Sequence, residues 1–74
     1  MKPDLTKKAI AGILIAMRQV LADAVITASE SFQAIQQGEQ NQAIGTILAI
    51  EDKLEQALAL YRAAIALHRA GREP

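Results

Sequence analysis

The chain contains no cysteine, and its two prolines stand at its ends, Pro3 and Pro74. The lack of cysteine excludes a fold held by disulfides and makes a cytoplasmic location the default expectation. Because the interior has no proline, nothing in it removes a backbone donor from a long helix. Aromatic residues make up only 3% of the chain, so alanine, isoleucine and leucine supply the apolar mass. Of these, leucine and alanine favour helices.

The chain also has no excess of positive or negative charge, because its eight basic and eight acidic side chains give a net charge of zero. A neutral chain has no general attraction to nucleic acid or anionic lipid. The longest uninterrupted apolar run covers residues 9–17 and is ended by Arg18. That run is about half of the roughly 20 residues that span a bilayer. We therefore expect no membrane-spanning segment.

Apolar residues recur every three or four positions, which is the period of an α-helix. Asp4 is the expected N-cap of a first helix at about residues 4–37, Gly38 the residue after its end, and Asn41 the N-cap of a second helix. We expect one all-α unit over residues 1–74: a helix at 4–37, a turn at 38–40, and an antiparallel helix at 41–70. The first helix is expected to pack through Ile10, Leu14, Met17, Leu21, Ala24, Ala28, Phe32 and Ile35.

A turn at residues 38–39 predicts the register of this hairpin. Residues whose numbers sum to about 77 should lie opposite each other, because both helices rise equally per residue. The large ring of Phe32 would then face Gly45, where a side chain is missing.

The apolar arc of the first helix covers roughly 160° of its circumference, which is more than one neighbouring helix can hide. Two hairpins forming a four-helix bundle are the simplest solution, so we expect a homodimer. Basic residues gather at the open end of the hairpin and acidic residues in the turn half. An antiparallel arrangement of the two copies would therefore place opposite charges side by side.

No pattern in the sequence indicates catalysis, a metal or a cofactor. His68 is the only histidine, it is expected beside the inner apolar stripe, and no second metal ligand accompanies it. Glu51 and Glu55 are one helical turn apart, and we interpret them as a solvated acidic flank. We expect a protein that is not an enzyme, with no catalytic, cofactor-binding or metal-binding residues.

Four apolar residues are expected away from the main stripe. Ile15 and Ile26 are three helical turns apart on the first helix, and Leu60 and Leu67 are seven residues apart on the second. Either the dimer interface covers them or they bind another protein. Our leading hypothesis is a small protein-interaction module of regulatory type, acting as an adaptor, inhibitor or chaperone through these residues.

The alternative is a nucleic-acid-binding regulator of the small helical-bundle type. Lys7, Lys8, Arg69 and Arg72 converge on the open end of the expected hairpin and could contact an anion or nucleic acid. Two features weigh against nucleic acid as a partner. The basic residues lie at one end and not along a face, and no aromatic residue stands among them to stack on bases.

Overall fold

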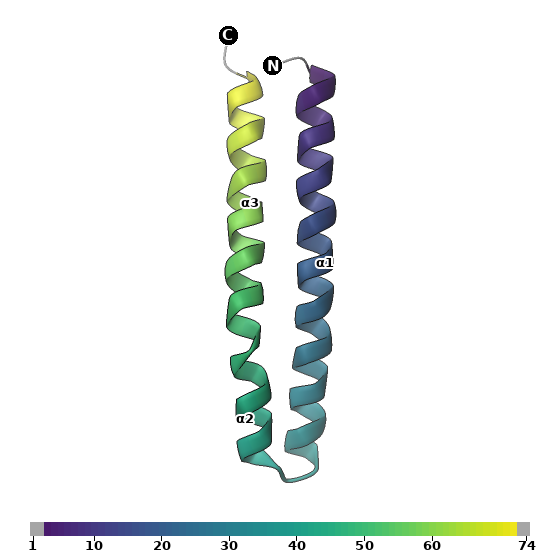
Figure 1. The fold of residues 1–74 in the computed structure, drawn as a ribbon, viewed down its shortest axis with the longest axis vertical. Helices are drawn as coiled ribbons and strands as arrows, with labels where there is room; N and C mark the ends of the chain where they lie inside the picture. Colours follow the sequence, from purple (N-terminus) through teal and green to yellow (C-terminus); the bar gives the residue numbers. More distant parts are fainter. Residues whose placement is uncertain (1–2, 73–74) are drawn as a thin grey trace.

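The computed structural model describes residues 3–72 of the chain, and the side chains from Asp4 to Gly71. It consists of α1 (Pro3–Gln36), α2 (Gln40–Leu48) and α3 (Ile50–Arg72). Helices α2 and α3 follow one another along one line, antiparallel to α1, so that the start of α1 lies beside the end of α3 (Figure 1). The all-α hairpin is thereby confirmed. Its dimensions of 57 × 14 × 12 Å are those of a single layer of two rods.

The two ends of α1 follow from proline and glycine chemistry. Pro3 opens the helix, where its missing N–H would have no helical partner and its fixed φ suits the first turn. Asp4 is therefore inside the helix, and its prediction as the N-cap is wrong. At the other end Gly38 has a φ of 80°. Its N–H bonds to the Ile35 carbonyl at 3.1 Å, and the Glu39 N–H bonds to the Ala34 carbonyl at 3.0 Å. This pair of bonds is a Schellman motif, with glycine at the left-handed position.

The second rod is not the single helix that the sequence predicts. Helix α2 begins after Glu39, whose carbonyl accepts a 3.0 Å hydrogen bond from Ala43, so Asn41 lies inside the helix and is not its cap. A break follows at Ala49, where the N–H bonds to the Thr46 carbonyl three residues back at 3.2 Å. This is the tighter 3₁₀ pattern, and it separates α2 from α3. Glycine and threonine at positions 45–46 are weak helix formers, which favours a break here.

The two rods meet along an inner seam of buried and half-buried side chains that alternate at spacings of three and four residues. This is the heptad repeat of paired helices. On α1 the seam consists of Thr6, Ile10, Ile13, Met17, Val20, Ala24, Thr27, Ser31 and Ala34; on the second rod it consists of Ala43, Thr46, Ile50, Lys53, Ala57, Leu60, Ala64 and Leu67.

The seam differs from the stripe that the sequence analysis assigned to α1. Ile10, Met17 and Ala24 belong to it, whereas Leu14 and Phe32 are exposed, as are Leu21, Ala28 and Ile35. The wide apolar arc of α1 permits more than one line of contact. The line actually used contains small residues, which let the two helices approach closely.

The core of the hairpin is small. The buried apolar residues are all alanines, namely Ala24, Ala34, Ala43, Ala57 and Ala64, and among the described side chains no large one is fully buried. A buried methyl group contributes only about 0.8 kcal/mol, far less than a buried leucine or isoleucine. The contact between the two rods is therefore a weak source of folding energy.

Three contacts define the register of the hairpin. A Cβ atom placed on Gly71 would lie 3.1 Å from Cγ2 of Thr6. Lys53 Nζ lies 3.7 Å from Asp23 Oδ2, and Ser31 Oγ lies 2.7 Å from the Ala43 carbonyl oxygen. The residue numbers of these pairs sum to between 74 and 77, so the predicted register is confirmed at the open end and slips by up to three residues at the turn.

The predicted fit of Phe32 against Gly45 is wrong. Phe32 is 60% exposed, and no atom lies within 4 Å of the position of a Cβ on Gly45. Phe32 follows the seam residue Ser31 and so points to one side of the contact. Gly45 precedes the seam residue Thr46, and its Cα lies outside the contact.

Candidate interaction surface

Most of the large apolar side chains of this protein lie on the outside of the hairpin. Nine of them occupy equivalent positions, one or four residues after the seam residues Ile10, Met17, Ala24, Ser31, Ala43, Ile50 and Ala57. We call this set the apolar face: Leu14, Leu21, Val25, Phe32 and Ile35 on α1, and Ile44, Leu54, Leu58 and Tyr61 on α2 and α3.

The geometry of an antiparallel pair places both halves of this set on the same side of the hairpin. A residue one position after a seam residue is rotated by 100° around the helix axis, and a residue four positions after it by 40°. The rotation has the same hand in both rods when each is followed from its N-terminus to its C-terminus. Because the rods run in opposite directions and face each other through the seam, equal turns bring both lines to one side. The apolar face therefore spans both rods on one side of the hairpin, and on α1 the exposed Arg18 interrupts it between Leu14 and Leu21.

The exposure of this face is large. It ranges from 39% for Leu21 to 64% for Val25. The described chain has an accessible surface of 5790 Å². A folded monomer of 8.0 kDa is expected to expose about 4,450 Å². The excess of about 1,300 Å² exceeds the roughly 800 Å² that each partner buries in a standard protein–protein interface.

The four residues proposed for partner binding are placed in two different environments. Ile15 is 50% exposed and Ile26 is 57% exposed, and neither belongs to the apolar face. Leu60 and Leu67 are half-buried members of the inner seam, continuing the line of Ala57 and Ala64. The expectation that Leu60 and Leu67 lie on an open flank is therefore wrong, because the heptad that brings those alanines against α1 carries the two leucines with them.

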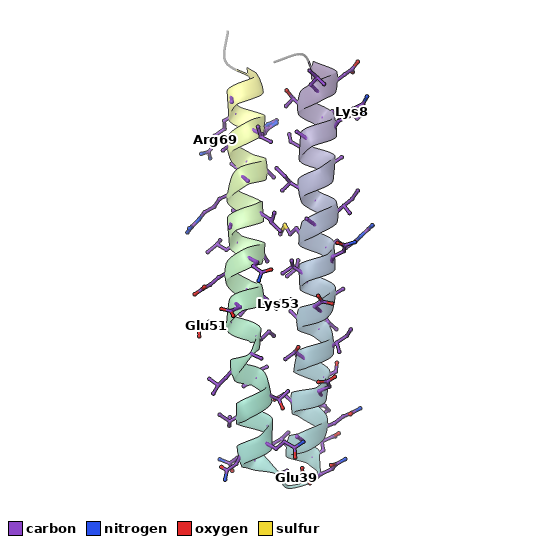
Figure 2. All side chains as sticks on the ribbon, viewed as in Figure 1. Lys8, Glu39, Glu51, Lys53 and Arg69 are labelled. Carbon is purple, nitrogen blue, oxygen red and sulfur yellow. The ribbon has the colours of Figure 1, made fainter. Side chains whose placement is uncertain are left out.

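Two of the basic residues at the open end, Lys8 and Arg69, lie on different sides of the hairpin and point toward its opposite outer flanks (Figure 2). Lys7, Lys8 and Arg69 are all exposed, and the side chain of Arg72 lies outside the described residues. Lys7, Lys8 and Arg69 therefore lie on the outer surface of the hairpin and outside the seam.

Charge is nevertheless divided between the two halves of the hairpin. Between Asp4 and Gly71, the open half (residues 4–19 and 57–71) has five basic side chains and one acidic, a net charge of +4 with neutral histidine. The turn half (residues 20–56) has six acidic side chains and one basic, a net charge of −5. The single base is Lys53, which reaches across the seam toward Asp23 between the rods (Figure 2).

The remaining polar groups form no reactive cluster in the part of the chain that the structure describes. His68 is exposed and not on the inner seam, and Glu51 and Glu55 are exposed on α3. Within residues 4–71 no three histidine, aspartate or glutamate side chains gather closely enough to hold a metal ion.

The sequence does not single out the polar residues of the seam, among them Ser31 and Thr27. The Ser31 hydroxyl donates a hydrogen bond to the carbonyl of Ala43, and the Thr27 hydroxyl donates one of 3.2 Å to the carbonyl of Asp23. Their signal was the spacing of Ala24, Thr27, Ser31 and Ala34, a heptad of small residues inside a wider apolar arc.

Helix α1 also has the length and composition to cross a membrane between Asp4 and Gln36, and 6% of its most apolar stretch is buried in the hairpin. Signal sequences and the core helices of other proteins share this property. The expectation of no membrane-spanning segment stays a prediction, and most of the apolar surface of α1 lies on the outside of the hairpin.

Comparison of the chain with protein-family models, with curated proteins and with solved structures finds no significant match in any of the three.

Proposed function

We propose that this protein is a non-enzymatic protein-interaction module that acts as a dimer of helical hairpins, two copies forming a four-helix bundle. The observation that carries the proposal is the difference in side-chain size between the buried core of the hairpin and its exposed apolar face. The buried core consists of alanines, while nine large apolar side chains share one exposed face. Folding energy comes mainly from burying large apolar side chains, so a hairpin built this way gains most of it by packing against other helices.

The surface outside the apolar face offers a place for a further partner. Ile15 and Ile26 share one line along α1 and remain exposed when the apolar face is covered. An apolar line on a helix suits an amphipathic helix of another protein, packed alongside. In this arrangement the dimer is the scaffold and α1 presents Ile15 and Ile26, as an adaptor, inhibitor or chaperone-like regulator would. Leu60 and Leu67 would contribute by holding α3 against α1.

Two neighbouring residues of α1 give a matched test of self-association. Val25 is 64% exposed and lies on the apolar face, whereas Ile26 is 57% exposed and lies outside it. Val25→Asp is expected to shift the sedimenting species from dimer to monomer, because a carboxylate would be buried without a partner. Ile26→Asp is expected to leave the dimer intact. Equal behaviour of the two variants would contradict the proposal that this face associates.

The adaptor role has its own test. A helix-containing partner captured by the wild-type dimer should be lost from an Ile15→Asp, Ile26→Asp double variant that sediments as a dimer. Retention of every partner by that variant would remove Ile15 and Ile26 as the binding line and leave self-association unaffected.

A further inference from the structure

We propose that the occupant of the apolar face is a second copy of this chain in antiparallel orientation, related by a two-fold axis that passes close to Leu21 and Leu54. The inference rests on the proposed function, and it adds the orientation, the alignment and the residues at the centre of the bundle.

The area of the exposed surface fits a second copy. Each chain exposes about 1,300 Å² more than a compact monomer of its mass. Two copies that remove this excess from water would bury about 2,600 Å² in total, within the roughly 2,000–5,000 Å² of obligate homodimers. Because the face spans both rods, its natural counterpart is another pair of rods, which a second hairpin supplies.

The order of side chains along α1 favours a two-fold axis at Leu21. The residues in line with the α1 part of the apolar face are Lys7, Ala11, Leu14, Arg18, Leu21, Val25, Ala28, Phe32 and Ile35. In an antiparallel pair centred at Leu21, Leu14 lies against Ala28 of the partner copy, and Phe32 against the partner copy's Ala11. Leu14 and Phe32 thus each meet an alanine, which favours close packing on both sides of the axis.

The same axis fits the second rod without adjustment. Leu21 and Leu54 have residue numbers that sum to 75, inside the range of 74 to 77 of the contacts between the rods. They therefore lie at the same level of the hairpin. A two-fold axis through both residues crosses the apolar face at right angles to the helices and places Leu54 against Leu54 of the partner copy.

Charge selects this orientation over the parallel one. Antiparallel packing sets the open half, with its net charge of +4, beside the turn half of the partner copy, with its net charge of −5. Parallel packing would set like charges together over the full length of both halves. Opposite charges side by side attract, and like charges repel, so the charge pattern suppresses the parallel dimer.

The distance between the same residue in the two copies distinguishes the two orientations. Because the chain has no cysteine, one introduced cysteine per copy carries the only spin label. Gln37→Cys places the label on the exposed turn. The hairpin is 57 Å long, so antiparallel copies should give a distance of about 50 Å between the two labels by pulsed electron resonance. A parallel dimer would give less than about 25 Å, the width of a four-helix bundle.

The possible outcomes separate the orientation from the proposed function. A distance near 50 Å supports the antiparallel pair. A short distance with a dimeric mass overturns the orientation and leaves self-association in place. A monomeric mass with no measurable distance overturns both, and binding of that monomer to vesicles of phosphatidylcholine and phosphatidylglycerol would assign the apolar face to a lipid surface.

A disulfide test checks the position of the axis. Leu21→Cys is expected to form a disulfide with itself under mild oxidation, giving a covalent dimer that runs at twice the mass of the chain. Ile15→Cys, which is exposed but lies outside the apolar face, is the matched control and is expected to stay uncrosslinked. Crosslinking of Ile15→Cys in preference to Leu21→Cys would place the interface on another side of α1.

Discussion

The hydroxyl of Ser31 on α1 donates a 2.7 Å hydrogen bond to the carbonyl oxygen of Ala43 on α2. The bond joins the two rods near Gly38, where the chain reverses: Ser31 lies seven residues before this glycine and Ala43 five residues after it. This bond gives a polar residue of the seam a hydrogen-bond partner. A half-buried hydroxyl without a partner would destabilise the folded state. The contact fixes how the rods meet at the turn, and it leads to the first of four predictions.

Ser31→Ala is expected to lose a hydrogen bond that contributes about 1 kcal/mol to the free energy of unfolding. Ser29→Ala is the matched control, because Ser29 is exposed on the same helix and the substitution changes only helix propensity. Urea unfolding at one fixed protein concentration should therefore rank Ser31→Ala below Ser29→Ala by about that amount. Equal midpoints would show that the Ser31 bond contributes nothing to stability.

Two glycines are expected to respond to alanine in opposite ways. Gly45 lies inside α2 with no atom within 4 Å of an added Cβ, so Gly45→Ala should raise the free energy of unfolding by up to about 1 kcal/mol. Gly38 has a φ of 80°, so Gly38→Ala should lower it by about 1–2 kcal/mol. Thermal unfolding followed by circular dichroism measures both. A destabilising Gly45→Ala would mean that another surface packs on α2 at that position.

The ion pair of Lys53 with Asp23 is expected to contribute little, because Asp23 is 61% exposed and Lys53 is 37% exposed. A double-mutant cycle of Asp23→Asn and Lys53→Gln should give a coupling of about 0.2–1 kcal/mol at low salt. The coupling should vanish in 1 M sodium chloride, where the screening length falls to about 3 Å. A coupling that survives high salt would show that a further surface shields the pair from solvent.

Phe32 should behave as a buried residue although a single hairpin leaves it 60% exposed. Truncation of a core phenylalanine costs about 3–5 kcal/mol, whereas most substitutions at open surfaces stay within about 0.5 kcal/mol. Phe32→Ala is therefore expected to lower the free energy of unfolding of the dimer, measured in urea, by more than about 1 kcal/mol. Ile26→Ala, at 57% exposure outside the apolar face, is the control with a small expected effect. A small cost for Phe32→Ala would argue that nothing covers this ring.

Much of the hairpin could be predicted from the sequence because its signals are local. The helical period of the apolar residues, the glycine at position 38 and the prolines confined to the ends define two antiparallel rods and the place where they turn. The register followed from equal helical rise. The break at Ala49 could not be predicted, because the weak helix formers Gly45 and Thr46 do not determine where a single 3₁₀ bond replaces the helical pattern.

The line of contact between the rods was the main error, and its cause is physical. An apolar arc of about 160° allows the helix to turn by tens of degrees and still place apolar atoms against its neighbour. Large side chains such as Leu14 and Phe32 suggested one line, but the rods meet along a neighbouring line whose buried residues are alanines and whose half-buried residues include Ile13 and Ser31. The same rotation moved Leu60 and Leu67 from an expected flank into the seam, while Ile15 and Ile26 stayed exposed.

We expect that a single hairpin cannot hide its own apolar surface from water. Sedimentation equilibrium of the wild-type chain at micromolar concentration, with helix content followed by circular dichroism over a dilution series, tests it most directly. We expect a species of twice the 8.0 kDa chain mass whose helix content falls as dilution separates the copies. A fully helical, cooperatively unfolding monomer of 8.0 kDa over the same range would contradict it.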